Sequence, residues 1–136
     1  AKQLHDIALM IKRRSLVVLV SDLFSNVDDI LAGLDHLRFD GHDVVVLHTL
    51  DSHELEFPFK GAWCFEGLEE EEPLTTQAER IREEYLTNFN EYMEALRAGC
   101  VSSQIDYTTV NTALPLNDVL SEFVVQRQAM SNGGRR

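Results

Sequence analysis

Asp22 is the residue of this sequence whose position most suggests chemistry. It follows the apolar run LVVLV at residues 16–20, and Ser21 and Ser25 stand beside it, where a buried strand would turn toward a helix. A strand-end aspartate serves as the nucleophile of some phosphatases, so one hypothesis is Mg-dependent phosphoryl transfer by Asp22. Such enzymes also need a second carboxylate for Mg²⁺ and a lysine at a later strand end.

The sequence lacks these companions. Leu23 and Phe24 follow Asp22, so there is no Asp-x-Asp, and the last predicted strand runs into Asn111 and Thr112 without a lysine. There is no Gly-rich phosphate loop, no Gly-x-Ser-x-Gly elbow and no Cys/His pair at useful spacing. The sequence therefore favours a protein without enzymatic activity, and phosphoryl transfer is the alternative.

A second group of polar residues, His48, Asp51 and His53, stands at the end of another apolar run and has the side chains of a metal site. Zinc sites use three or four such ligands in a defined geometry with supporting hydrogen bonds. His48 lies within the run itself, where a hydrogen-bonded core histidine is the commoner case. We interpret the group as structural, and His42, beside Gly41, as a turn residue.

Length, charge and cysteine content limit the class of protein. The 136 residues are enough for one domain, and the net charge of -11 argues against nucleic acids and anionic membranes as partners. Cys64 and Cys100 match neither a zinc pattern nor a disulfide framework, which favours a reduced, cytoplasmic setting. No apolar run approaches the roughly 20 residues that span a bilayer, and no signal peptide is visible.

The elements that must position these residues follow an α/β pattern. Apolar residues at helical spacing predict a first helix, with Lys12–Arg14 closing its last turn. The runs at residues 16–20 and 43–50 are typical of strands covered on both faces. The helix between them should be capped by Ser25, with Asp28 in a capping-box position. The result is a βαβ unit of a doubly wound sheet.

A small β-hairpin insertion, at about residues 56–76, interrupts this pattern. The segment ELEFPFKG should be extended, AWCFEGL and PLTT should form two strands, and the acidic run EGLEEEE between them should be a solvated tip. That run could also bind Ca²⁺ or a basic partner. Trp63 and Phe65 share one strand face, and we favour their packing on the domain over an exposed aromatic patch.

A long helix, capped by Thr76 and Glu79, should follow the hairpin and bury one stripe of side chains. IDYTTV then predicts a third core strand, and a last helix should begin after Pro115. Residues 131–136 should form a disordered tail. The predicted buried stripe consists of Ile81, Tyr85, Phe89, Tyr92, Met93, Leu96 and Cys100.

Three core strands are few for a doubly wound sheet. The run at residues 16–20 should lie at the border of that sheet, with its faces and one edge in need of cover. We therefore expect residues 1–130 to be the C-terminal half of a larger domain. We also expect self-association through the exposed edge of strand 16–20, or recruitment of the absent half.

Four segments carry a resemblance to a known family: SLVVLVSDLF, HLRFDGHDVVVLHTLD, ELEFPFKG and the pattern IREEY…LRAGC…IDY…PLNDVL. In order and spacing they are similar to the C-terminal half of the von Willebrand factor A-like domain in the bacterial domain of unknown function 58 family. The resemblance implies a partial doubly wound, Rossmann-like three-layer sandwich with strand order 3-2-1-4-5-6, of which this chain holds the last three.

The resemblance also implies a metal-ion-dependent adhesion site, in which Asp22 would be the ligand after strand 4. Ser21 and Ser25 would orient the carboxylate or a bound water. The Asp-x-Ser-x-Ser motif that completes such sites is absent, and Leu55 stands in place of its second serine in the nearest segment. We therefore expect a partial, vestigial site, with no cofactor in this chain and Mg²⁺ only in a longer protein.

The function implied by the resemblance is that of a protein-binding platform. Members of the family are associated with MoxR-type AAA+ ATPases and are thought to assist the assembly of other proteins. Under this hypothesis the contact face would lie around Asp22, and no catalytic residue is expected.

Overall fold

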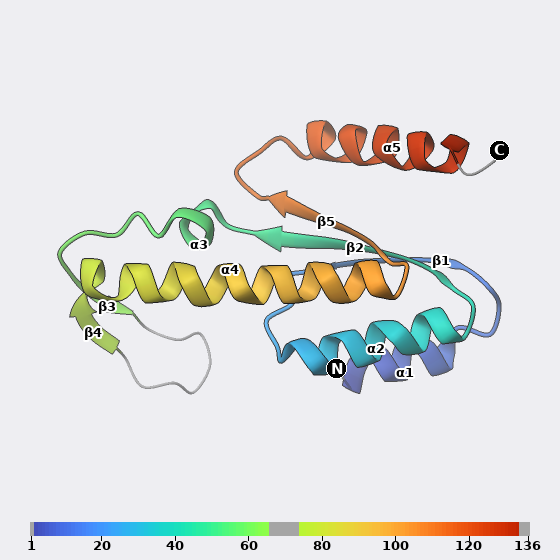
Figure 1. Ribbon diagram of the computed structural model, residues 1–136, viewed down its shortest axis with the longest axis horizontal. Coiled ribbons are helices and arrows are strands. Elements are labelled where there is room, and N and C mark those ends of the chain that lie inside the picture. Colours follow the sequence, from blue (N-terminus) through green and yellow to red (C-terminus); the bar gives the residue numbers. More distant parts are fainter. Residues whose placement is uncertain (1, 66–73, 134–136) are drawn as a thin grey trace.

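The computed structural model describes residues 2–65 and 74–133, and Figure 1 shows their arrangement. This described part of the chain contains five helices and five strands, which alternate except where β4 follows β3. In order they are α1 (Lys2–Met10), β1 (Leu16–Ser21), α2 (Val27–Phe39), β2 (Asp43–Leu50), α3 (Ser52–Glu56), β3 (Ala62–Phe65), β4 (Leu74–Gln77), α4 (Ala78–Ser102), β5 (Asp106–Asn111) and α5 (Leu116–Gly133).

A three-stranded parallel sheet in the order β1-β2-β5 forms the centre of the fold. Helices α1, α2 and α4 lie on one side of it, and α5 lies on the other (Figure 1). Strands β3 and β4 pair antiparallel as a separate hairpin. The predicted partial α/β, Rossmann-like sandwich with a hairpin insertion is therefore confirmed. No described helix has the length and apolar character needed to cross a membrane.

Strand β2 is buried on both faces, as its composition predicts. Val44 and Val46 face α2 and α4, and they pack in the larger core with Leu34 and Leu96. The alternate residues of the strand face α5 and form a smaller core. That smaller core consists of Val45, Leu47 and Val110, and the partly buried Val119 and Phe123 of α5 pack against it.

Strand β1 lies at the border of the sheet, as predicted, because β2 is its only partner among the described strands. The prediction that both its faces are covered is wrong. Leu16, Val18 and Val20 are 57%, 49% and 61% exposed, because they face the side on which α5 covers β2 and β5. Val17 and Leu19 point the other way and pack against the larger core.

The structure corrects the predicted end of α1 and the predicted start of α2. Helix α1 ends at Met10, before the basic residues that should have closed it. Asn26, not Ser25, caps α2, because its side chain accepts hydrogen bonds from the backbone N–H groups of Asp28 and Asp29 at 2.9 and 3.4 Å. The N–H of Ser25 instead donates to Leu23 O at 2.8 Å in the preceding turn.

The cap predicted for α4 is also wrong. The helix begins at Ala78, and its N-cap residue Gln77 makes no side-chain capping hydrogen bond. Glu79 instead accepts a hydrogen bond from the backbone N–H of Gly61 at 2.8 Å, which ties the start of α4 to the hairpin. At the other end of the chain, α5 continues to Gly133, three residues into the predicted tail.

The insertion begins with a short helix where an extended segment was expected. Asp51 and Glu54 form a capping box around the start of α3, and this local pairing stabilises the helical turn. Beyond it, Trp63 is 44% exposed, and its ring lies edge-on to Phe59 with 4.9 Å between centroids. The predicted acidic tip lies outside the described residues, as does the side chain of Phe65.

Candidate functional site

A cleft of about 500 Å³ opens at the carboxyl ends of β1 and β2. Open α/β sheets generally bind their ligands beyond the carboxyl ends of the strands, so the position itself suggests a site. The walls come from the loop after β1, the end of β2, helix α3 and the first half of α4. The lining residues are Asp22, Phe24, Ser25, His48, Leu50, Glu54, Tyr85, Asn88, Phe89 and Tyr92.

The side chain of Asp22 is exposed at the rim of this cleft. Its Oδ1 accepts hydrogen bonds from Ser21 Oγ at 3.4 Å and from the backbone N–H of Phe24 at 3.5 Å. Ser21 Oγ also accepts from the N–H of Leu23 at 3.0 Å. Asp22 and Ser25 therefore line the cleft together, and Ser21 supports the carboxylate from outside the lining.

The loop that carries Asp22 is held by hydrogen bonds from two other elements. Leu23 is buried and adopts a left-handed backbone conformation with φ of 52°, and its carbonyl accepts a hydrogen bond from the Tyr92 hydroxyl. The same hydroxyl lies 3.4 Å from Ser25 O. From β2, His48 Nε2 lies 2.8 Å from Asp22 O. These contacts fix the backbone from which Asp22 projects.

His48 is the hydrogen-bonded core histidine that the sequence indicated. It is 1% exposed, and since a carbonyl only accepts, Nε2 carries the proton that is donated to Asp22 O. Nδ1 then accepts from the Tyr107 hydroxyl at 2.6 Å. Burial lowers the pKa of His48, against smaller opposing effects from its hydrogen bond to Asp22 and from nearby Glu54. The ring is a neutral wall of the cleft, with both nitrogens engaged.

The other residues of the predicted His/Asp group do not line the cleft, and their hydrogen bonds stabilise the start of α3. Asp51 Oδ1 accepts from the backbone N–H of His53 at 2.8 Å and contacts its Nδ1 at 2.7 Å. These hydrogen bonds lower the pKa of Asp51. His42 lies in the turn between α2 and β2, as predicted, and it is buried there at 1% exposure, with its Nδ1 accepting from the N–H of Ser15 at 3.3 Å.

The donor set of the cleft does not fit a retained Mg²⁺ ion. Mg²⁺ prefers six oxygens at octahedral positions, and its protein sites supply one or two carboxylates with phosphates and waters completing the shell. Asp22 already uses Oδ1 as a hydrogen-bond acceptor. In the part of the chain that the structure describes, no three His, Cys, Asp or Glu side chains are placed to hold a metal ion. We therefore assign no step to a metal.

Aromatic residues of α4 form one wall of the cleft. Tyr85 and Phe89 stack with 5.8 Å between ring centroids and an interplanar angle of 12°. Burial raises the pKa of Tyr85 and of Tyr92, and a nearby carboxylate, Glu54 or Asp22 respectively, adds to the effect.

The sequence placed these aromatic residues in a buried stripe, but the structure shows that stripe only in part. Leu96 and Cys100 are buried, as predicted. Tyr85, Phe89 and Tyr92 are half-buried, because one side of the stripe faces the cleft. Helical spacing is the same for a residue that faces a core and for one that faces a cleft, so periodicity could not separate the two. Sequence reasoning also missed Glu54 and Asn88, for which no motif exists.

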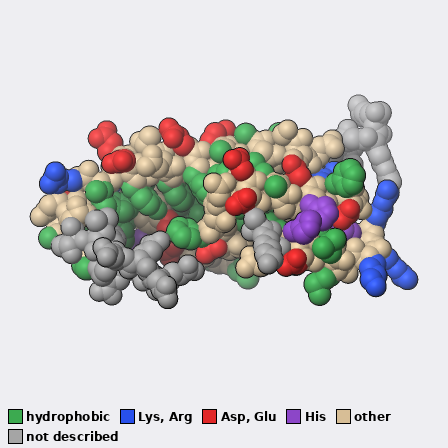
Figure 2. Space-filling model, turned by 90° about the horizontal axis from the view of Figure 1, so that it is seen from below, with side chains coloured by type: hydrophobic (Ala, Val, Ile, Leu, Met, Phe, Trp, Pro, Cys, Tyr) green, Lys and Arg blue, Asp and Glu red, His purple; other side chains and the backbone are tan. Residues whose placement is uncertain are grey.

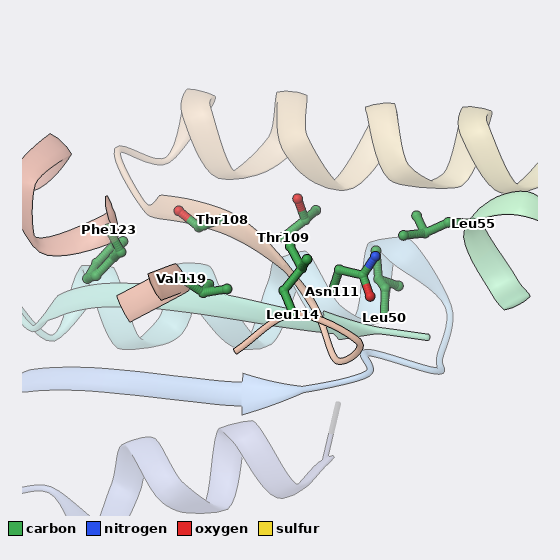
Figure 3. Close-up of a pocket in the computed structure, with 8 residues that line it drawn as sticks. All are labelled: Leu50, Leu55, Thr108, Thr109, Asn111, Leu114, Val119 and Phe123. Carbon is green, nitrogen blue, oxygen red and sulfur yellow. The ribbon is translucent and has the colours of Figure 1, made fainter. Parts of the chain in front are cut away.

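A second cavity, of about 360 Å³, lies between β5, the end of β2 and the start of α5. Figure 3 shows that its side chains are aliphatic, hydroxyl, amide and phenyl groups. None of its lining residues titrates, so it offers no acid, base or charged ligand. The lining residues are Leu50, Leu55, Thr108, Thr109, Asn111, Leu114, Val119 and Phe123.

Comparison with known protein families finds a match. The sequence pattern of a family described as "Protein of unknown function DUF58" matches residues 1–95 of the chain. This range includes both strands that border the cleft, the loop of Asp22 and the aromatic residues of α4. No curated protein and no solved structure matches the chain.

Proposed function

Since this chain belongs to the DUF58 family, whose description assigns no activity, we propose that it is a non-enzymatic protein-interaction module. The contact face is the rim of the cleft around Asp22. In the von Willebrand factor A-like architecture that the sequence resembles, this loop is the vestige of a metal-ion-dependent adhesion site. The proposed partner is a MoxR-type AAA+ ATPase, and the proposed process is the assembly of other proteins.

The observation that carries this proposal is the exposed aromatic residue beside the cleft. Phe24 is 87% exposed, although it follows directly on the buried Leu23 and lies on a loop held by hydrogen bonds from β2 and α4. A large apolar side chain on a fixed backbone is a typical anchor of a protein interface, because its ordering costs little on binding.

The geometry of Asp22 supports interaction over phosphoryl transfer. A phosphoryl-transfer site needs several charged groups converging on one point, to hold Mg²⁺ and to stabilise the transferred group. The residues lining this cleft supply two carboxylates and no lysine or arginine. Hydrolysis of a phosphate monoester by the chain with Mg²⁺, lost in Asp22→Ala, would overturn the proposal.

A binding measurement with matched variants tests the interaction directly. We expect immobilised chain to bind the purified MoxR-type ATPase, and Phe24→Ala to weaken the affinity about tenfold by removing an interface anchor. Phe39→Ala is the matched control, because Phe39 is 89% exposed at the end of α2. Equal losses from both variants, or no loss from Phe24→Ala, would contradict the proposed contact face.

We also propose that a second copy of the chain pairs with the open edge of β1. Within residues 2–65 and 74–133 no strand pairs with the outer edge of β1, so the strand presents backbone groups without a sheet partner together with three exposed apolar side chains. Exposed apolar residues of α5, among them Val124, lie on the same side of the sheet. Pairing of two such edges would cover both at once, and α5 would supply further apolar surface.

A further inference from the structure

We infer that the cleft between β1, β2, α3 and α4 binds an arginine side chain of a partner protein. This inference rests on the proposed function and names the chemical group that the contact face recognises. The guanidinium would lie against the aromatic wall of α4, within reach of the carboxylates of Asp22 and Glu54.

The charge of the cleft selects a cation. Its lining contains two carboxylates, Asp22 and Glu54, and no lysine or arginine. The two carboxylates line the same cleft as Tyr85 and Tyr92, and they add to the raised pKa values of these two tyrosines. Figure 2 shows acidic side chains spread along a broad face of the molecule, with Lys and Arg mainly toward its ends. An anionic ligand would be repelled here.

One oxygen of each carboxylate accepts hydrogen bonds that orient the side chain. Glu54 Oε2 accepts the backbone N–H of Asp51 at 2.7 Å, as part of the capping box of α3. Asp22 Oδ1 accepts from Ser21 Oγ and from the N–H of Phe24. Among the described residues, Glu54 Oε1 and Asp22 Oδ2 have no hydrogen-bond partner, so each carboxylate keeps an oxygen for an incoming donor.

The aromatic wall favours a planar organic cation over a metal ion. Tyr85 and Phe89 stack nearly parallel, and Tyr92 follows on the same helix. A guanidinium stacks on aromatic faces while its N–H groups reach carboxylates, whereas a lysine ammonium is a compact, more strongly hydrated charge. The cleft volume of about 500 Å³ falls within the range of sites that enclose small organic groups.

Isosteric probes can test this inference on the whole chain. We would titrate it with the peptide acetyl-Gly-Arg-Gly-amide and with the same peptide carrying citrulline, which keeps the shape of arginine and removes its charge. The readout is the shift of the Tyr85, Phe89 and Tyr92 ring signals by NMR. We expect saturable shifts with the arginine peptide and binding at least about fivefold weaker with citrulline.

Variants that keep the hydrogen bonds but remove the charges complete the test. Asp22→Asn and Glu54→Gln together should weaken arginine binding about fivefold. Glu56→Gln, an exposed residue of the same short helix outside the cleft, is the matched control and should leave binding unchanged. Equal binding of citrulline, or an unchanged affinity in the double variant, would overturn the inference.

A titration with Mg²⁺ alone completes the experiment. Its result distinguishes a failure of the arginine site from a failure of the proposed interaction function. Saturable binding of Mg²⁺ that shifts the Asp22 amide, with no response to the arginine peptide, would overturn the arginine site while leaving the interaction module intact. Arginine binding that persists when the ATPase fails to bind would support the cleft and contradict the proposed partner.

Discussion

Strands β1 and β2 have similar apolar sequences and very different surroundings. They pair in parallel, with Val18 of β1 opposite Val45 of β2, so these two valines face the same side of the sheet. Val45 is fully buried under α5, whereas Val18 is 49% exposed. The difference arises because α5 packs on β2 and β5 and does not extend over β1.

The sequence of a strand determines which of its side chains are apolar, whereas other elements of the fold determine which of those side chains are covered. A continuous apolar run indicates side chains that are stable when covered on both faces. Whether both faces are covered depends on helices that lie elsewhere in the sequence. In β1 one face packs against the larger core through Val17 and Leu19, and the other face is an exposed apolar stripe next to an open edge. Such a surface is typical of an interface.

Paired substitutions of the two opposed valines should show the largest difference. Val45→Ala should lower the free energy of unfolding by about 2–3 kcal/mol, because it removes buried methyl groups and leaves a cavity. Val18→Ala should change it by less than about 0.5 kcal/mol in dilute solution. Urea denaturation followed by circular dichroism measures both. Similar losses in the two variants would mean that β1 is covered to the same extent as β2.

The carboxyl ends of the two strands differ in a titratable side chain, because His48 of β2 stands opposite Ser21 of β1. We therefore expect the free energy of unfolding to depend on pH through His48. Burial lowers the pKa of His48 below its ordinary value of 6.5. Above pH 6.5 the histidine is neutral in the folded and unfolded chain and contributes no pH dependence. As the pH falls through 6.5, the unfolded chain takes up a proton that the folded chain does not, so stability falls.

The slope of this loss is at most about 1.4 kcal/mol per pH unit, the value for one proton. Urea denaturation between pH 7.5 and pH 5 measures it. His48→Gln should flatten the slope, because it removes the titrating ring. An equal slope in wild type and His48→Gln would show that another group is responsible.

Substitutions in the turn after β1 should have a smaller effect on stability, and two adjacent residues of this turn serve as test and control. Asn26→Ala should cost about 1 kcal/mol, because the side chain accepts from two backbone N–H groups at the start of α2. Ser25→Ala should be close to neutral, because Ser25 does not cap the helix. Thermal denaturation measures the stability of both variants. A larger loss of stability in Ser25→Ala than in Asn26→Ala would show that Ser25 caps α2, as the sequence predicted.

The smallest effect on stability, with the clearest effect on assembly, is expected from a charge on the open edge. Val18→Lys should change the free energy of unfolding by less than about 0.5 kcal/mol, but it should abolish self-association, since lysine on an edge strand opposes pairing. Val101→Lys on α4 is the matched control, because Val101 is also exposed, at 70%, and α4 lies on the other side of the sheet. Sedimentation at high concentration that finds wild-type chain monomeric would contradict the proposed edge pairing.

The sequence by itself determined the elements and their order. Apolar runs and helical spacing placed the three core strands, the hairpin strands and the long helices, because these signals depend on neighbours a few residues away. The same reasoning placed Asp22 at the end of a strand and that strand at the border of the sheet. It misplaced the start of α2, because adjacent polar residues compete for the same cap and only one makes the hydrogen bond. It overlooked α3, because a helix of 5 residues is too short to show an apolar period.

Only the tertiary structure decided which surfaces are covered and which side chains meet. The cleft exists because α4 places Tyr85, Phe89 and Tyr92 opposite a loop more than sixty residues earlier in the chain. His48 became a neutral wall of that cleft through partners on two other elements. Local patterns record which face of an element is apolar, but the neighbour that meets this face is chosen by packing between distant segments.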